Sequence, residues 1–226
     1  MEYVISDIHG HYDTFCRLME KIKFCGSDRL YVLGDMIDKG RDGIRLAKTL
    51  FAMPEAECIA GNHEYDFLKF FHAKLKTDND EEIMKSLRAY FPDGYLLDWE
   101  TVEAFDNLPY YIKKEKFIGV HAGLPLRSDG TTEAPENATR EQLVYDRRFV
   151  QRNVFPKGEQ CIIFGHTPTR NISGADEILF YRSGRHNGDI SDFCKIHIDT
   201  GVYLGGVLGC VEINTCRAFY VLGERT

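Results

Sequence analysis

The sequence contains no Cys-x-x-Cys pair, although it has seven cysteines among its 226 residues. Their odd number and scattered positions argue against both a zinc ribbon and a disulfide framework. Reduced thiols in a reducing compartment are the simpler interpretation. The first residues also lack the basic start and long apolar core of a secretory signal peptide, so we expect a cytoplasmic protein.

Long apolar runs and an excess of basic residues are also missing. No apolar stretch approaches the roughly 20 residues that a membrane-spanning helix needs. The formal net charge is −7, which disfavours broad binding to nucleic-acid backbones because that binding requires a basic surface. We therefore expect neither a membrane nor a nucleic-acid partner. A local anionic substrate is still compatible with this charge, because bound divalent cations can reverse the field at one site.

Strand and helix patterns alternate regularly at the start of the chain. Apolar runs at 3–5, 30–33 and 56–60 predict strands, and residues 11–23 and 42–53 predict amphipathic helices. Strand–helix alternation with such short connections implies right-handed βαβ units and a parallel sheet region.

A charged helical segment at 64–107 is predicted to follow, and most of the remaining chain is predicted to be strand. The predicted later strands are 110–113, 116–120, 160–164, 178–181, 193–198, 206–213 and 217–222. Two sheets with helices outside them account for this order, so the fold class is α/β, a two-sheet β-sandwich flanked by helices. No repeat, linker or low-complexity run interrupts the chain, and we expect one domain over residues 1–226 with the helical segment inserted.

Six short polar segments each directly follow an apolar run. They are Asp7-Ile8-His9-Gly10, Gly34-Asp35-Met36-Ile37-Asp38, Gly61-Asn62-His63-Glu64, Val120-His121-Ala122-Gly123, Gly165-His166-Thr167-Pro168 and Asp199-Thr200-Gly201. Their carboxylate, imidazole and amide groups are ligands of hard or borderline divalent cations. Ligands of open α/β sheets bind beyond the carboxyl ends of strands, so we expect one metal site assembled from distant parts of the chain.

The spacing of the donors suggests how they are shared. Asp7 and His9 are one residue apart, which on an extended segment places both side chains on one side, so that they can share a cation. Asp35 can bridge two cations with its two oxygens. The remaining donors are an amide oxygen and two imidazole nitrogens, from Asn62, His121 and His166. This set suffices for two divalent cations roughly 3.5–4 Å apart, which lower the pKa of a bridging water and clamp the oxygens of a displacement at phosphorus. We therefore expect Asp35 to lie close to these three side chains.

The combined motif resembles the signature of the calcineurin-like metallophosphoesterases. It consists of Asp-x-His, Gly-Asp-x-x-Asp and Gly-Asn-His-Glu, followed by Val-His-Ala-Gly and Gly-His-Thr, and the resemblance extends from Ile5 to about Gly206. Within this superfamily the chain is most similar to the compact bacterial and phage branch of the phosphoprotein phosphatases, which includes the phosphatase of bacteriophage lambda. The resemblance implies a four-layer αββα fold.

The resemblance also implies roles for individual residues. One metal would be held by Asp7, His9 and Asp35, and the other by Asp35, Asn62, His121 and His166. His63 would be the general acid that protonates the leaving alkoxide, and Asp38 would orient it, since an imidazole beside a carboxylate can hold a proton near neutral pH. Manganese is the expected metal, although iron and zinc suit the same ligands.

The phosphate-binding residues depart from the family pattern. The family usually has arginine directly after the Gly-Asp-x-x-Asp motif, where this chain has Lys39. Lysine cannot bind two phosphate oxygens as a planar fork, so we expect weaker phosphate binding, with Arg41 as a substitute donor. Arg147 resembles the family's second phosphate-binding arginine. Because Arg148 is its neighbour, the match could also fall one residue later. Asn62 is a further candidate for phosphate contact.

Several other polar residues are assigned structural roles. Glu64 is expected to favour the start of its helix through the helix dipole rather than bind metal. Asp199 is expected to fix a turn, and His11 to lie on a solvated helix face. Tyr203 is a candidate to overhang the site.

Three functions fit the sequence. The first is a metal-dependent phosphomonoesterase that acts on a phosphorylated protein, at serine and threonine or at tyrosine, or on a small phosphoester. The alternative is a symmetrical dinucleoside-polyphosphate hydrolase acting on diadenosine tetraphosphate, since related chains of this size have that activity. Few basic residues lie near the motifs, which favours the monoesterase. The third hypothesis is an inactive metal-binding scaffold, and the complete donor set argues against it.

Overall fold

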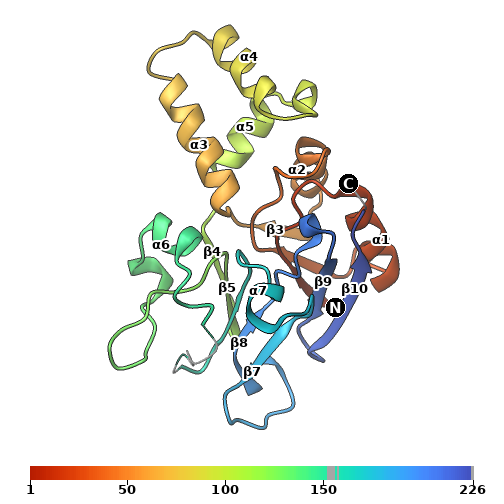
Figure 1. The fold of residues 1–226 in the computed structure, drawn as a ribbon, viewed down its shortest axis with the longest axis vertical. Helices are drawn as coiled ribbons and strands as arrows, with labels where there is room; N and C mark the ends of the chain where they lie inside the picture. Colours follow the sequence, from red (N-terminus) through yellow and green to blue (C-terminus); the bar gives the residue numbers. More distant parts are fainter. Residues whose placement is uncertain (152–155, 157, 225–226) are drawn as a thin grey trace.

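Two five-stranded sheets form the centre of the protein in this computed structural model, which describes residues 1–151, 156 and 158–224 (Figure 1). The first sheet has the order β10-β9-β1-β2-β3 and the second has the order β4-β5-β6-β8-β7. The strands of the first sheet are β1 Glu2–Ile5, β2 Arg29–Val32, β3 Ala56–Cys58, β9 Val207–Glu212 and β10 Arg217–Leu222. Those of the second are β4 Tyr111–Lys113, β5 Phe117–Val120, β6 Cys161–Phe164, β7 Leu179–Arg182 and β8 Phe193–His197.

Each sheet contains three neighbouring parallel strands. β1, β2 and β3 are parallel in the first sheet, and β5, β6 and β8 are parallel in the second. The remaining strands pair antiparallel with them or with each other toward the sheet edges. The parallel region predicted from the first 61 residues is therefore confirmed, and the second half of the chain adds another.

The alternation of side chains along each strand divides the apolar core into layers. In β1, Val4 points into the core between the two sheets, whereas Tyr3 and Ile5 face the other side. That outer face of the first sheet is covered by α1 (Tyr12–Ile22) and α2 (Gly43–Phe51), whose buried residues include Leu18 and Leu50. The two helices thus fix the polar segments that precede them.

The second sheet has a thinner outer cover. Ile118, Val120 and Phe164 pack there against Leu143 and Phe149, which come from the six-residue helix α6 (Arg140–Tyr145) and the chain after it. The short helical elements of the same half are η2 Pro135–Asn137, α7 Arg170–Ser173, η3 Ile190–Asp192 and η4 Val202–Leu204. The two-sheet sandwich flanked by helices is confirmed.

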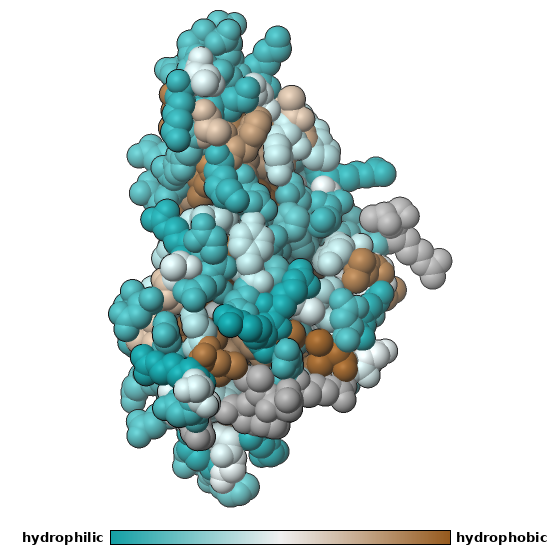
Figure 2. Space-filling view, turned by 60° about the vertical axis from the view of Figure 1, so that its left-hand side comes forward, coloured by the Kyte–Doolittle hydropathy of each residue, from teal (hydrophilic) through white to brown (hydrophobic). Residues whose placement is uncertain are grey.

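A helical projection extends away from the sheets and is formed by α3 (Asn62–Lys74), α4 (Asp80–Tyr90), η1 (Gly94–Leu96) and α5 (Trp99–Asp106) (Figure 1). The surface around it is mostly hydrophilic, but apolar side chains gather over the projection (Figure 2). The predicted helical character of residues 64–107 is confirmed. Because α3 begins at Asn62, both Asn62 and His63 lie in its first turn. Among the described residues, no helix has both the length and the apolar character required to cross a bilayer.

One expectation about a polar residue is wrong. His11 was expected on a solvated helix face, but it precedes α1 and is only 3% exposed. The helical pattern could not show this, because the residue lies at the helix N-cap, where the following helix does not set the direction of its side chain.

We expect Phe67→Ala to destabilise the helical projection. Phe67 is fully buried, and its ring centroid lies 5.2 Å from that of Phe91 and 5.4 Å from that of Phe105. Truncation of a buried phenylalanine typically lowers the free energy of unfolding by about 3–5 kcal/mol. Urea denaturation would measure the loss, with Phe70→Ala, at a partly exposed site on the same helix, as the control. Equal losses in the two variants would contradict this packing.

Candidate metal centre

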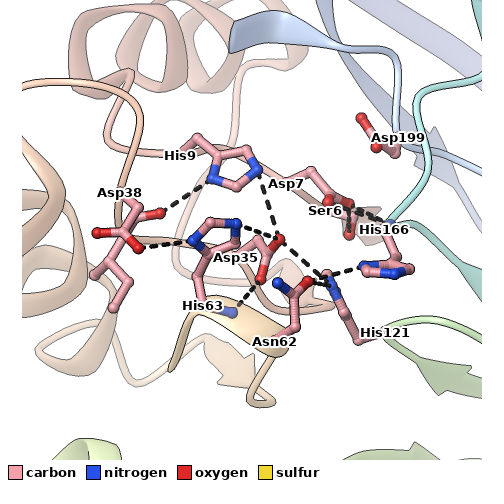
Figure 3. Close-up of polar contacts among 12 residues, drawn as sticks. Ser6, Asp7, His9, Asp35, Asp38, Asn62, His63, His121, His166 and Asp199 are labelled. Carbon is pink, nitrogen blue, oxygen red and sulfur yellow. Dashed lines mark hydrogen bonds and ion pairs between the residues drawn. The ribbon is translucent and has the colours of Figure 1, made fainter. Parts of the chain in front are cut away.

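The six polar segments follow the six parallel strands. Those after β1, β2 and β3 belong to the first sheet, and those after β5, β6 and β8 belong to the second. Because carboxyl ends of parallel strands meet at one edge of a sheet, the topology brings all six segments to one place. Side chains from both sheets converge there on Asp35 (Figure 3).

One oxygen of Asp35 lies at the centre of this group. Its Oδ2 is 3.4 Å from His121 Nε2, 3.5 Å from His9 Nε2 and 3.9 Å from His63 Nε2. These separations exceed those of good hydrogen bonds. They leave room for cations between the oxygen and the nitrogens, because bonds from zinc-like ions to such ligands are about 2.0–2.2 Å long. Asp35 is itself 2% exposed.

A second group of donors lies on the side of Asn62. Its Oδ1 is 3.0 Å from His121 Nε2 and 2.8 Å from His166 Nδ1. Two sets of three side chains each offer donor atoms that lie within 4.8 Å of one another. The first set is Asp35, His121 and His166, and the second is His9, Asp35 and His63. His166 Nε2 is buried and has no hydrogen-bond partner within the described part of the chain. Nitrogen and oxygen donors held this close suit a borderline divalent cation.

Backbone carbonyls orient two of the imidazoles. His9 Nδ1 lies 3.1 Å from the carbonyl oxygen of Ile37, and His121 Nδ1 lies 2.8 Å from that of Leu33. A ring that donates its Nδ1–H to a carbonyl keeps its lone pair on Nε2, and both Nε2 atoms face Asp35. This arrangement is common for metal-binding histidines.

The charges of the histidines depend on their surroundings. Burial lowers the pKa of His9 to about 4, and burial together with His121 and Arg147 lowers that of His166 to about 3. Burial also disfavours charged His121, but the Asp35 carboxylate outweighs it and raises that pKa to about 10. The Asp35 carboxylate therefore favours the charged form of His121, whereas binding of a cation requires the neutral form of the ring.

Asp7 lies beside the segment of His166. The backbone N–H of His166 is 3.2 and 3.1 Å from its two carboxylate oxygens, and the Ser6 hydroxyl donates to it as well. Burial raises the pKa of Asp7 to about 6. The two closest donor groups do not include Asp7, so its role as a ligand remains a prediction. The expected extended geometry of Asp7 and His9 is wrong, because their φ angles are +53° and +50°.

Left-handed backbone is concentrated at this centre. Six of the eight non-glycine residues with positive φ in the described ranges belong to the polar segments or directly follow one. They are Asp7, His9, Asp35, Asp38, Lys39 and His166. Non-glycine residues in this region are strained, and such strain clusters at functional sites. Close approach also requires glycine here, because a Cβ on Gly61 would lie 2.2 Å from Asp35 Oδ1.

Glu64 organises the loop that carries Asp35. Its buried carboxylate accepts backbone hydrogen bonds of 2.8 Å from Gly61, Asp35 and Met36 and of 3.2 Å from Ile37. It therefore assists the start of α3, as expected, and also joins this helix to the segment after β2. The first role agrees with the spacing of Gly-Asn-His-Glu, since glutamate is favoured at this position of a capping box. The contacts with the distant segment had no signal in the sequence.

His63 and Asp38 form a pair at the more open side of the centre. His63 Nδ1 lies 2.7 Å from Asp38 Oδ2, and the His63 side chain is 20% exposed, compared with 3% for His9. Burial lowers the pKa of His63, but the hydrogen bond with Asp38 and the charge of Asp35 outweigh it and raise the pKa above its ordinary value. The ring is thus accessible and favours its protonated form.

The candidate phosphate-binding cations differ in their placement. Lys39 and Arg41 are exposed, and Lys39 Nζ lies 5.9 Å from the ring centroid of Tyr203. Arg147 Nη1 donates a 3.4 Å hydrogen bond to Thr167, next to His166. Arg148 instead pairs with Asp146 through two nitrogens. Arg147 is therefore the better placed of the two arginines.

Tyr203 lies at the His9 end of the centre. Its ring centroid is 4.7 Å from that of His9, with the rings nearly perpendicular. The position agrees with the expected overhang. Asp199 accepts the N–H of Gly201, as its assignment to a turn predicts.

We expect Glu64→Gln to weaken divalent-metal binding, although Glu64 is not a proposed ligand and only binds the backbone of Asp35 and its neighbours. The amide offers one acceptor oxygen in place of two, so the backbone around Asp35 loses part of its support. Loss of such supporting contacts typically lowers metal affinity about 10- to 100-fold. Calorimetric titration with manganese would measure this. Glu57→Gln is the control, because Glu57 is exposed and paired with Lys114. Equal affinities in both variants would contradict the role of Glu64.

Comparisons with known proteins agree with this geometry. A family model for calcineurin-like phosphoesterases matches residues 3–197. A symmetrical bis(5′-nucleosyl)-tetraphosphatase of Buchnera aphidicola from Acyrthosiphon pisum is 30% identical over 56% of this chain and 46% of its own length. The chain therefore spans about half the length of this relative. A protein of the same name from Buchnera aphidicola of Baizongia pistaciae is 27% identical, with 96% of both chains covered.

Solved structures share the fold at low sequence identity. A protein assigned as a diadenosine tetraphosphatase has a TM-score of 0.74 and 17% identity, with 100% of this chain and 94% of that chain covered. A cold-active protein-tyrosine phosphatase of a Shewanella species has a TM-score of 0.55 and 16% identity, with 97% and 79% covered. The chain belongs to the calcineurin-like phosphoesterases, a family of dinuclear metal-dependent enzymes.

Proposed function

We propose that this chain is a metal-dependent hydrolase of dinucleoside polyphosphates that cleaves a tetraphosphate bridge symmetrically. The proposed metal-dependent hydrolysis is supported by the convergence of His9, His63 and His121 on one oxygen of Asp35. The substrate class is supported by the alignment with a symmetrical bis(5′-nucleosyl)-tetraphosphatase over 96% of both chains. The sequence alone favoured a phosphomonoester, and the comparisons support the alternative better.

The donor set fits two divalent cations that share Asp35. Asn62, His121 and His166 would hold one cation together with Asp35, and Asp7 and His9 would complete the other. When bound, such a pair lowers the pKa of a water molecule between the ions and neutralises charge on the phosphoryl oxygens. Manganese is the proposed metal, as expected for bacterial-type members of the family.

His63 acts on the leaving oxygen in this proposal. Its accessible ring carries a proton that it donates to the oxygen released from phosphorus. Asp38 holds the ring by its Nδ1, so that Nε2 faces the reacting group. When the leaving group is a nucleoside diphosphate, the developing charge is also stabilised by nearby cations. Lys39, Arg41 and Arg147 are the residues proposed to bind the phosphate chain.

Phosphoprotein hydrolysis is the second candidate, because a protein-tyrosine phosphatase shares the fold. The centre would serve both reactions with the same groups, so a direct substrate comparison is required. We expect kcat/KM for diadenosine tetraphosphate, measured with manganese, to exceed that for phosphoserine, phosphothreonine and phosphotyrosine peptides by about tenfold or more, a difference of about 1.4 kcal/mol in transition-state binding. ADP should be the sole nucleotide product. Faster turnover of a phosphopeptide would overturn the proposed substrate.

His63→Asn should lower kcat by about 10²- to 10⁴-fold, the usual contribution of a general acid. The variant should retain two equivalents of manganese by elemental analysis, since the proposal places His63 beside the metals rather than among their ligands. Loss of metal in the variant would instead make His63 a ligand. The inactive-scaffold hypothesis would be revived by wild-type protein that binds manganese but hydrolyses neither para-nitrophenyl phosphate nor the dinucleotide.

Lys39→Arg should tighten inhibition by inorganic phosphate about fivefold, because a guanidinium can form two charge-assisted hydrogen bonds where an ammonium offers a point charge. The inhibition constant against para-nitrophenyl phosphate measures the change. Lys85→Arg, on α4 of the helical projection, is the matched control. An unchanged constant in Lys39→Arg would show that residue 39 does not contact phosphate.

A further inference from the structure

Three tyrosines form a row that begins beside the metal centre. The ring centroid of Tyr145 lies 6.4 Å from that of His166, Tyr65 lies 6.1 Å from Tyr145, and Tyr110 lies 6.1 Å from Tyr65. We call Tyr65, Tyr110 and Tyr145 the tyrosine row. Each of these three residues is half-buried.

The rings are held in place from several elements. Tyr65 lies on α3, one turn after Asn62, and Tyr145 is the last residue of α6. The Tyr65 hydroxyl donates to Glu141, and the Tyr145 side chain is hydrogen-bonded to Asp66. Rings fixed in this way lose little conformational entropy when a ligand stacks on them, which is why rigid aromatic side chains make efficient binding surfaces.

Charge is distributed differently at the row and at the centre. Near the row, Lys69 Nζ lies 5.3 Å from the ring centroid of Tyr65 and 3.4 Å from Asp66. The charges of Lys69 and Arg140 also act on Glu141, so positive and negative charges balance locally. The Arg140 guanidinium lies 5.0 Å from the ring centroid of Tyr110. Arg147 and Lys39, which have no ion pair within the described part of the chain, lie instead near the metal ligands. A phosphate chain thus fits the centre, whereas an uncharged planar group fits the row.

We propose that the tyrosine row is a stacking site for a nucleobase of the substrate, with Tyr65 as its main contact. This inference rests on the proposed function and adds the residues that select a nucleoside. With the phosphates at Asp35, a nucleoside attached to them reaches the row past His166. Aromatic stacking tolerates every base because each base has a π face, so the site selects for a base rather than for one particular base.

Direct binding tests this assignment without turnover. The dissociation constants of AMP and ribose 5-phosphate for manganese-loaded protein are measured by calorimetry. The two ligands differ at the anomeric carbon, where AMP carries adenine and ribose 5-phosphate carries a hydroxyl group. We expect AMP to bind about tenfold more tightly, in line with the usual effect of one aromatic stack. Tyr65→Ala should abolish this preference, whereas Tyr65→Phe, which keeps the ring, should retain it. Tyr95→Ala is the matched control, since Tyr95 is 77% exposed on the helical projection.

The outcomes separate the two proposals. No preference for AMP, or a preference that survives Tyr65→Ala, overturns the stacking site even if diadenosine tetraphosphate is hydrolysed. A preference that depends on Tyr65 supports the site even if the symmetrical cleavage fails. Tighter binding of O-phosphotyrosine than of AMP, lost in Tyr65→Ala, would assign the row to a peptide instead. Thermal unfolding of each variant checks that Tyr65→Ala remains folded, and Tyr110→Ala provides an independent second variant on the row.

Discussion

The Asp35 carboxylate is the group on which the centre depends. It is buried at the junction of two sheets, where an isolated charge would be costly. The imidazoles of His121 and His9 hold its pKa well below the usual range despite the opposing effect of burial. The Oδ1 of Asp35 accepts a hydrogen bond from the backbone N–H of His63. The backbone N–H of Asp35 donates in turn to the Glu64 carboxylate. The Asp35 side chain therefore links the segments of both sheets and is also the central candidate ligand for the cations.

Much of this arrangement could be predicted from the sequence. Apolar runs located the strands, and the polar segments after them located the centre, because a parallel sheet places all such segments at one edge. Asp35 does lie close to Asn62, His121 and His166. These predictions depend on strand order and periodicity, and both are encoded locally in the chain.

Other features depended on contacts between distant segments and had no local signal. Glu64 binds the backbone of residues about 28 positions away. The left-handed conformations of Asp7 and His9 follow from the loops that converge around them. Aspartate and histidine adopt this conformation more often than most residues, but this preference does not identify the positions that do so. Arg147 and Arg148 are neighbours of the same type, so only the contacts of Thr167 and Asp146 distinguish them.

Substrate preference is a separate question, because metal ligands and an acid–carboxylate pair serve many phosphoesters equally. Discrimination has to come from groups around the centre that contact the parts of the substrate beyond phosphorus. Among the described residues, the charges beside the tyrosines are balanced, whereas the cations beside the metal ligands have no ion pair. The surroundings of the centre therefore divide into two chemically different zones. Counting basic residues along the sequence could not reveal that division, because it depends on which charges are paired.

Helix α3 joins the centre to the helical projection in one rigid element. Its first two residues are Asn62 and His63, and its 13 residues extend about 20 Å. A rotation of this helix about its first turn moves the amide of Asn62 and the ring of His63 together, relative to His9 and His121, which come from the segments after β1 and β5. Any molecule that tilts the distant end of α3 would therefore alter metal coordination and proton donation at the same time.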